Sequence, residues 1–300
     1  MKLRLLVSLC SAALLAAVAF AQSPEPEPPS LPPDGPRPLA SKKMQQAQEH
    51  LDLVYADYGE RKMHLDLFLP TGEVKPRPAI LVIHGGGWLK GDKEKFRPIA
   101  RKLAERGYVT AAVEYRLGGE AKFPAAIHDC NTATRWLRAN AQKYQIDPKR
   151  IAAVGGSAGG HLVGLMATGS HVEQLQGVGN NDQQSHLQAA IVMAGPLELA
   201  SGPVADKSRN NPQDSNSNKW LGKSVDKAPE LYKLASATTH VTKETPPILF
   251  MVGEHDQPLR NLATRQQLRE LGIPTGVRVY AAGKHGCWNR PPWQDVMIDD

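Results

Sequence analysis

Cysteine is scarce in this 300-residue chain. It occurs three times, as Cys10, Cys130 and Cys287. Three cysteines cannot form the disulfide framework of a small secreted domain, and no cysteine–histidine cluster has the spacing of a zinc site. The apolar positions of residues 127–141 recur at helical spacing and include Cys130. We therefore expect Cys130 to be a buried thiol, and we expect no metal site.

Blocks of like charge are also absent. The chain has 36 Lys and Arg against 30 Asp and Glu, a formal net charge of +6, and its basic residues are scattered without a basic run or an aromatic–basic stripe. We therefore expect no nucleic-acid partner. Hydrophobic residues make up 41% of the chain and charged residues 22%, which excludes general disorder and allows a packed core.

The N-terminus has the features of an export signal. Residues 1–21 begin with the basic Lys2 and Arg4, continue with an apolar stretch and end with the small-x-small sequence Ala19 to Ala21. This pattern predicts a signal peptide cleaved near Ala21 and a secreted or periplasmic protein. The alternative is an uncleaved anchor, but the apolar stretch is shorter than the roughly 20 residues of a membrane span. We expect no stable span after cleavage.

Proline dominates the next segment. Eight of the residues between 22 and 38 are proline. A stretch of this composition is extended and cannot bury a core, so residues 22–40 are interpreted as a linker. The folded domain is expected to occupy residues 41–300.

Short apolar runs alternate with helical patterns through that domain. We expect strands at 64–69, 79–83, 108–115, 151–154, 189–194, 248–252 and 277–280, and helices at 97–106, 124–142, 158–168, 259–271 and from 293. This alternation predicts an α/β fold with a doubly wound, mostly parallel sheet and helices on both faces. The segment Ser201–Asn218 is rich in polar residues and lacks periodicity. It is expected to be a long functional or mobile loop between two core strands.

A G-x-S-x-G pattern lies between a predicted strand and a predicted helix, at residues 155–159. A sharp strand-to-helix turn exposes the hydroxyl of Ser157, and the flanking glycines relieve crowding of the backbone. The following helix brings N–H groups and positive partial charge close to that hydroxyl. The pattern alone occurs by chance in about one of eight such chains, so its structural context carries more weight. The alternative is an ordinary glycine-rich turn.

A second glycine-rich motif, His84-Gly-Gly-Gly87, follows the buried strand predicted at 79–83. Consecutive glycines allow backbone N–H groups to approach a substrate oxygen. Esterases combine such groups with the N–H that follows the nucleophile to hold an oxyanion. The donors here would be Gly85, Gly86 and Ala158. A phosphate-binding loop is the alternative, but its usual continuation is absent. We expect His84 itself to be structural.

A serine nucleophile requires a base, and the base requires an orienting acid. On this kind of sheet the acid and then the histidine follow the serine along the chain. Asp256 follows the strand predicted at 248–252, and His285 follows the last predicted strand. Both positions are carboxyl ends of strands, where α/β sheets build their sites. We identify Asp256 and His285 as acid and base, with Glu254 and His255 as nearby alternatives.

These motifs together resemble the α/β-hydrolase superfamily, and within it the carboxylesterases that bear an HGGG motif. A narrower resemblance is to the secreted acetyl esterase/lipase group, which includes bifunctional acetylxylan/feruloyl esterase-like enzymes of polysaccharide-degrading bacteria. It covers about residues 50–300. Two departures are that relatives often have Asn in place of Glu114 and that the last helix is short. The segments that carry the narrower resemblance are His84–Trp88, Glu114–Leu117, Gly156–His161 and Lys284–Trp288.

The resemblance implies a serine carboxylic-ester hydrolase that needs no cofactor and removes acetyl or feruloyl groups from polysaccharide. A lipid or small-molecule carboxylesterase is the alternative substrate class. A non-catalytic binding protein of the same fold is disfavoured, because such proteins usually lose a member of the triad. Trp88 and Trp288 are candidate substrate-binding residues, since aromatic faces stack on sugar or feruloyl rings, with core packing as an equal alternative. Asp129 and Arg135 are expected on a solvated or structural helix face.

Overall fold

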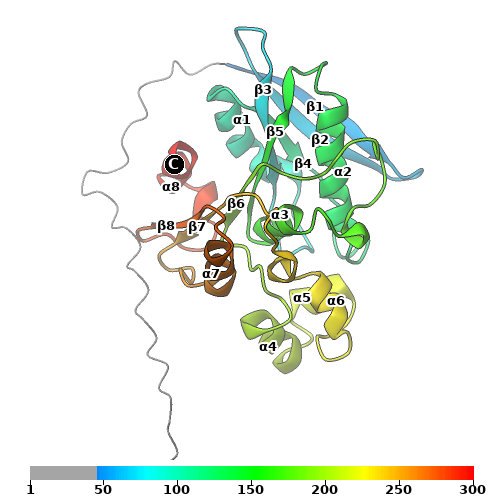
Figure 1. Ribbon diagram of the computed structural model, residues 1–300, viewed down its shortest axis with the longest axis vertical. Helices are drawn as coiled ribbons and strands as arrows, with labels where there is room; N and C mark the ends of the chain where they lie inside the picture. Colours follow the sequence, from blue (N-terminus) through cyan, green and yellow to red (C-terminus); the bar gives the residue numbers. More distant parts are fainter. Residues whose placement is uncertain (1–45) are drawn as a thin grey trace, which may run out of the picture. The chain divides into compact units, whose positions relative to one another are not determined.

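An eight-stranded sheet organises residues 46–300, the part of the chain that this computed structural model describes (Figure 1). The spatial order is β1-β2-β4-β3-β5-β6-β7-β8, with β1 and β2 antiparallel to their neighbours and β3 to β8 parallel. The strands are β1 (Ala47–Asp57), β2 (Lys62–Pro70), β3 (Arg77–Ile83), β4 (Val109–Val113), β5 (Ile146–Gly156), β6 (Ala189–Met193), β7 (Ile248–Gly253) and β8 (Thr275–Tyr280).

The predicted fold class is confirmed by this sheet and by the helices on both of its faces. All seven strands expected from the sequence are present, with shifted ends. The predicted signal peptide (1–21) and linker (22–40) lie outside the described residues, as do the first residues of the predicted domain.

The centre of the sheet aligns two of the glycine-rich motifs. The apolar strand β3 is buried along almost its whole length and lies between β4 and β5. Its last residue, Ile83, pairs with Gly155 of β5. Because parallel strands end at the same edge, this register brings the His84–Gly87 segment beside the turn that contains Ser157.

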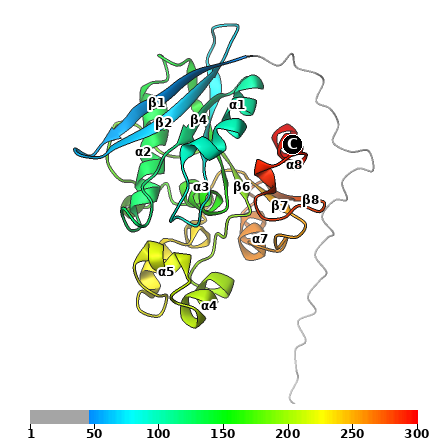
Figure 2. The same ribbon diagram turned by 180° about the vertical axis from the view of Figure 1, so that it is seen from behind.

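The helices divide the core into two layers (Figures 1 and 2). The helices α2 (Ala125–Ala139), α3 (Ala158–Thr168) and α7 (Leu262–Glu270) bury apolar residues against one face of the sheet. The helices α1 (Arg97–Glu105) and α8 (Trp293–Asp299) cover part of the other face. The parallel strands β3, β5, β7 and β8 end at the same edge of the sheet, where the segments that follow them begin.

The expectation of a long loop at Ser201–Asn218 is wrong. This segment contains α4 (Gly202–Asn210) and most of α5 (Asn216–Leu221), and α6 (Pro229–Leu234) follows. Helical periodicity is weak because few of its residues face a core. Local signals compensate: the Ser215 hydroxyl accepts a hydrogen bond from the N–H of Asn218, and Pro203 stands in the first turn of α4.

Strand β1 was not expected from the sequence. It pairs with β2 at the edge of the sheet, with irregular register, and most of its side chains are exposed or half-buried. An exposed edge strand has little alternation of apolar and polar residues, so its pattern is weak.

The polar residues of α2 are structural and not solvated. Asp129 is completely buried and forms an ion pair with Arg116 (2.7 Å), and the Tyr58 hydroxyl donates to it as well. Arg135 is also buried and donates to the carbonyls of Gly179 and Gln176.

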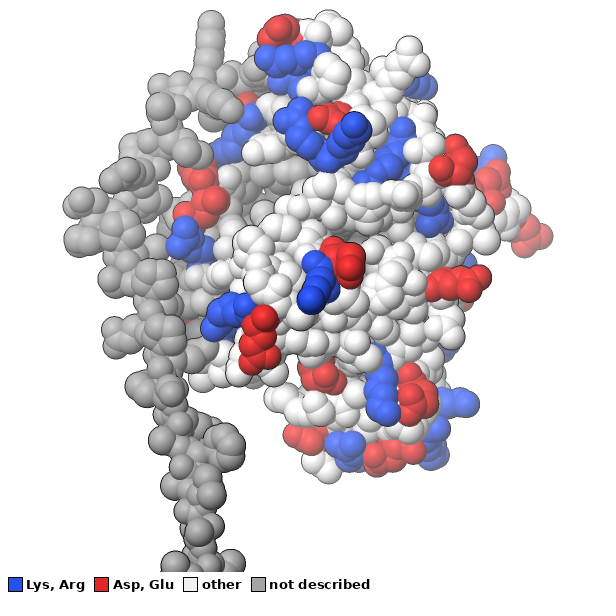
Figure 3. Space-filling model, viewed as in Figure 1, with Lys and Arg blue, Asp and Glu red and all other residues white. Residues whose placement is uncertain are grey.

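Charge on the surface is mixed. On the face shown in Figure 3, Lys and Arg side chains alternate with Asp and Glu and form no continuous field of one sign. Between residues 46 and 300, none of the helices is long and apolar enough to cross a membrane.

Candidate active site

The turn at Ser157 has the strained backbone that its motif predicts. Ser157 follows β5 directly and precedes α3, and its backbone has φ 57° and ψ −121°. A non-glycine residue adopts a positive φ at a cost of the order of 1–3 kcal/mol, so the surrounding packing must impose it. The Ser157 N–H donates to the carbonyl of Met193 in the next strand. The strain therefore directs the hydroxyl away from the sheet edge.

The structure brings the three predicted triad side chains together. His285 Nε2 lies 2.9 Å from Ser157 Oγ, and His285 Nδ1 lies 2.6 Å from Asp256 Oδ2. A carboxylate can only accept, so Nδ1–H donates to Asp256 and Nε2 is left to accept the serine proton. Asp256 is buried, whereas about half of the His285 side chain is exposed. The imidazole thus faces both a fixed anion and the solvent-accessible site.

The two alternatives for the acid and base lie elsewhere. The carboxylate of Glu254 accepts from the N–H of Ala282 at the surface, and it holds the β8 loop rather than an imidazole. His255 is exposed, and its ring has no hydrogen bond among residues 46–300. The geometry therefore favours Asp256 and His285.

Arg260 is a further neighbour of the acid. Its Nη2 lies 3.5 Å from Asp256 Oδ1, and its Nη1 donates to the carbonyl of Ala194 (2.7 Å). The guanidinium thus links the loop after β7 to the loop after β6. The contact places a guanidinium next to the carboxylate that orients His285.

The glycine-rich loop lies close to the serine. A side chain at Gly85 would begin 3.1 Å from Ser157 Cβ, so the two loops are in contact. Gly86 has φ 128°, and a Cβ there would overlap the Lys90 carbonyl oxygen. The N–H groups of Gly85 and Gly86 have no hydrogen-bond acceptor among residues 46–300. Ala158 opens α3, so its N–H has no acceptor within the helix. These three donors are free to bind an oxyanion.

His84 is structural, as expected. It is buried, its Nδ1–H donates to the carbonyl of Gly85 (2.8 Å), and its ring stacks on Tyr115. The Tyr115 hydroxyl in turn donates to the His84 carbonyl. Burial lowers the pKa of His84, so the ring stays neutral at the base of the loop.

Trp88 ends the loop and is anchored by a buried histidine. Its backbone has φ 63°, and its Nε1–H donates to Nδ1 of His161 (3.2 Å). His161 Nε2–H donates to the carbonyl of Ala235 (2.7 Å), which fixes the neutral tautomer. Complete burial lowers the pKa of His161 to about 4. The Trp88 ring also stacks on Trp220 of α5, with centroids 5.0 Å apart.

Trp288 has a different environment from Trp88. It is buried, and its ring fills the space that a side chain at Gly156 would need. It meets His285 edge to face, with centroids 5.2 Å apart, and it packs with the α1 and α8 side of the sheet. Trp288 therefore supports the nucleophile turn and the base from beneath. Neighbouring Cys287 is a buried free thiol, as is Cys130.

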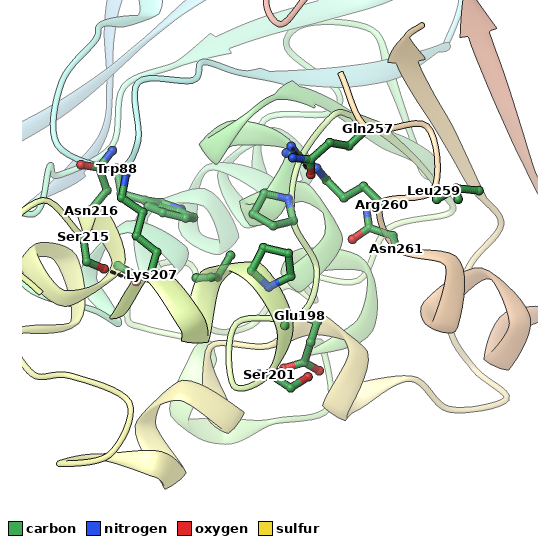
Figure 4. A pocket seen from close by; sticks show the side chains of 15 residues that line it. Trp88, Glu198, Ser201, Lys207, Ser215, Asn216, Gln257, Leu259, Arg260 and Asn261 are labelled. Carbon is green, nitrogen blue, oxygen red and sulfur yellow. Dashed lines mark hydrogen bonds between the residues drawn. The ribbon is translucent and has the colours of Figure 1, made fainter. Parts of the chain in front are cut away.

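A cavity of about 540 Å³ lies between the glycine-rich loop and the loop after β7 (Figure 4). Its lining includes Arg260, which contacts Asp256, but none of the three triad side chains. Its walls come from the glycine-rich loop, the segment after β6, α4, the start of α5 and the loop after β7. Trp88 is one of the lining residues and Trp288 is not. The polar side chains of its lining include Glu198, Lys207, Asn216 and Arg260.

The donor set at this edge suits acyl transfer. Within residues 46–300, no group of three or more His, Cys, Asp or Glu side chains could hold a metal ion. A serine, a tautomer-fixed imidazole, a buried carboxylate and free backbone N–H groups converge at one edge. This set can generate a nucleophile and stabilise a developing oxyanion.

Comparison with known proteins assigns the chain to a family. A family model described as BD-FAE matches residues 65–270, more than half of the chain. The chain belongs to the BD-FAE family. This family membership and the sheet confirm the predicted place in the α/β-hydrolase superfamily.

A curated relative of this BD-FAE chain is the probable carboxylic ester hydrolase LipM from Mycobacterium tuberculosis (strain ATCC 25618 / H37Rv). The two are 31% identical over 216 residues, which are 68% of this chain and 47% of LipM. The chain spans about half the length of the curated relatives it matches.

Two solved structures illustrate the shared architecture. The bifunctional GH43-CE protein of Bacteroides eggerthii has a TM-score of 0.73 and 27% identity, covering 84% of this chain and 37% of that protein. A propionate-bound esterase, Est2, from Thermogutta terrifontis has a TM-score of 0.68 and 25% identity, covering 85% and 92% of the two chains.

Two functional neighbours were missed from the sequence. Arg260 contacts Asp256 and the distant Ala194 carbonyl, and only the fold brings these together. His161 stands in the quoted Gly156–His161 motif, but its contact with Trp88 spans 73 residues of sequence. Its position one turn after the nucleophile, on a buried helix, was the available signal.

Proposed function

We propose that the protein is a serine carboxylic-ester hydrolase. The observation that carries the proposal is the continuous chain of hydrogen bonds from Ser157 Oγ to His285 Nε2 (2.9 Å) and from His285 Nδ1 to Asp256 Oδ2 (2.6 Å). In this arrangement the neutral imidazole removes the serine proton as Oγ attacks the ester carbonyl. Asp256 orients the ring and stabilises the imidazolium that forms.

The tetrahedral oxyanion would be held by the N–H groups of Gly85, Gly86 and Ala158. These donors have no competing acceptor among the described residues and come from two loops in contact, so they need little reorganisation when charge develops. The proton on His285 then passes to the leaving alcohol as the acyl-serine forms. Water repeats the attack with His285 as base, which releases the acid and restores Ser157.

We further propose that the substrate is an acetylated or feruloylated polysaccharide and that the protein is exported. The export pattern of residues 1–21 and the resemblance of the motifs to acetylxylan/feruloyl esterase-like enzymes support this substrate class. The match to a bifunctional GH43-CE protein agrees with it. The cavity that Trp88 and Arg260 line is large enough for a bulky alcohol or acyl group.

A small-molecule carboxylesterase is the second candidate. It is favoured by the likeness to Est2 of Thermogutta terrifontis, which was solved with propionate bound. Acetate release from acetylated xylan or pectin should exceed turnover of tributyrin if the carbohydrate class is right. The reverse order would favour the second candidate.

Replacement of the nucleophile tests the activity itself. Ser157→Ala should abolish hydrolysis of 4-nitrophenyl acetate and labelling by a fluorophosphonate probe while the circular dichroism spectrum is kept. Ser170→Ala is a matched control, since its hydroxyl has no hydrogen bond within the described residues and lies in another pocket. Wild-type protein that is folded but is not labelled would indicate a non-catalytic binding protein instead.

A further inference from the structure

Two cations flank the cavity that Trp88 of the glycine-rich loop lines. Lys207 of α4 and Arg260 of the loop after β7 both line it, and Figure 4 shows them on opposite sides. Lys207 has no ion-pair or side-chain hydrogen-bond partner among residues 46–300. On the opposite wall, Arg260 keeps one donor available, because its Nε–H donates to no described acceptor.

The carboxylate that lines this cavity is already engaged. One oxygen of Glu198 accepts from the N–H groups of Ala200 (2.6 Å) and Ser201 (3.0 Å), and the Ser236 hydroxyl also donates to it. Glu198 is therefore tied to the chain that leads into α4. It does not neutralise Lys207, so Lys207 is a cation of the cavity lining without a carboxylate partner among the described residues, whereas Arg260 faces Asp256 at 3.5 Å.

The wall that carries Lys207 is held in place. The neighbouring Ser208 is completely buried, and its hydroxyl contacts Asn218 Oδ1 (2.5 Å) and accepts from the N–H of Val225 (2.9 Å). At the start of α5, Asn216 packs against the position that a Gly87 side chain would occupy. Lys207 is thus carried by a helix that is hydrogen-bonded to α5, and α5 contacts the glycine-rich loop.

The opposite wall is equally ordered. Arg260 donates to the carbonyl of Ala194, and Asn261 bridges the backbone of the same segment by accepting from Leu197 N–H and donating to the Gly195 carbonyl. Both cations therefore project from anchored backbone. A donor that is already ordered loses less conformational entropy when it binds an anion than a mobile donor does.

From this arrangement we propose that the cavity is a carboxylate-recognising subsite, with Lys207 as the principal contact and Arg260 contributing from the facing wall. The preferred substrates are esters that carry a free carboxylate on either the acyl group or the alcohol, such as a uronate residue. Asn216, which has no side-chain partner among residues 46–300, adds an amide donor on the Lys207 side. This proposal rests on the proposed ester hydrolysis and names the charge of its substrate.

Matched ester pairs test the proposal. The acyl arm compares 4-nitrophenyl hydrogen adipate with 4-nitrophenyl methyl adipate, followed by release of 4-nitrophenol. The alcohol arm compares an O-acetyl galacturonic acid methyl glycoside with its methyl ester, followed by release of acetate. In each arm the measured quantity is the ratio of kcat/KM for the anionic ester to kcat/KM for the neutral ester.

The wild-type ratio should exceed one in at least one arm, which identifies the source of the carboxylate. Lys207→Met should lower that ratio about fivefold, which is typical of a partly exposed charge pair, and Lys207→Glu should lower it further. Lys207→Arg should keep it. Raising NaCl from about 50 to about 500 mM should reduce the wild-type preference, because salt screens such pairs.

Lys227→Met is the matched control, since Lys227 is an exposed lysine between α5 and α6 that does not line the cavity. It should leave the ratio unchanged. A wild-type ratio of about one in both arms would overturn the proposal. So would a decrease of the ratio that is equally large in the Lys207 and Lys227 variants. In that case the proposed ester hydrolysis still stands if the wild-type protein cleaves the neutral esters and Ser157→Ala does not. Failure of the wild-type protein to cleave any ester would refute the proposed function instead.

Discussion

The buried histidine behind Trp88 should make the protein sensitive to acid in a measurable way. His161 is completely buried, and its pKa is lowered from 6.5 to about 4 because burial disfavours the imidazolium. Both of its ring nitrogens are engaged, one accepting from Trp88 and the other donating to Ala235. Protonation would convert the acceptor nitrogen into a donor that faces another N–H.

The sign and size of the effect follow from this pKa. Between pH 6.5 and about 4, His161 takes up a proton in the unfolded chain but not in the folded one. The unfolded state therefore binds more protons, so the free energy of unfolding falls as the pH falls through this window and is fully restored above pH 6.5. A pKa difference of one corresponds to about 1.4 kcal/mol, so the difference between 6.5 and about 4 gives a total loss of about 3 kcal/mol.

His161→Gln isolates this contribution. The glutamine side chain can accept from Trp88 and donate to the Ala235 carbonyl, but it does not titrate. Urea unfolding followed by tryptophan fluorescence should show the variant about 1 kcal/mol less stable at pH 7.5, because its hydrogen bonds fit less well. Towards pH 4 the wild type should lose its advantage and become the less stable protein by about 2 kcal/mol.

The difference between wild type and His161→Gln removes the effect of acid on the other histidines, and a second variant serves as a control. His84, His186 and His240 also have pKa values lowered by burial, but they are present in both proteins and cancel in the difference. His255→Gln replaces an exposed histidine and should track the wild type at every pH. The quantity to compare is the difference in the free energy of unfolding between wild type and His161→Gln. If this difference changes by less than about 1 kcal/mol from pH 7.5 to 4, the reasoning is refuted.

Three further outcomes are expected. Gly86→Ala should lower kcat for 4-nitrophenyl acetate at least about 100-fold, since a Cβ there would overlap a carbonyl oxygen and displace an oxyanion donor; near-normal kcat would show that the loop is not used. Asp256→Asn should lower kcat about 10³–10⁴-fold with little change in KM, because the amide does not hold the reactive tautomer; steady-state kinetics decides. Cys130 and Cys287 should resist iodoacetamide in the folded protein and react only in urea, as mass spectrometry would show, and rapid labelling under native conditions would contradict their burial.

Much of the fold was predictable because local patterns and global position agree in the centre of the sheet. The unbroken apolar run at 79–83 indicated a strand buried on both faces, and β3 is such a strand. Glycines around Ser157 indicated the turn that the structure contains. The order of acid and histidine after the serine follows from the fold, and the strand ends of β7 and β8 then leave few candidates.

The remainder depends on contacts that no local pattern encodes. The helices α4 and α5 form on a segment that is polar because most of it faces solvent, so the sequence suggested a loop. Trp88 and Trp288 looked equivalent, yet one lines the cavity and the other lies beneath Gly156. The partners of Arg260 and His161 lie 66 and 73 residues away along the chain. Such pairs are set by how layers stack, which a one-dimensional pattern does not report.

His285, the proposed base of the triad, follows a strand at the edge of the sheet. His285 follows β8, which pairs only with β7 and has an open outer edge within the described residues, whereas Ser157 follows a strand at the interior of the sheet. Edge elements open at a lower free energy than central ones. Warming should therefore break the hydrogen bond between His285 and Ser157 while the central strands are still paired. Loss of the proposed esterase activity on heating would then precede the loss of secondary structure, and it would be reversible if only β8 separates from the sheet.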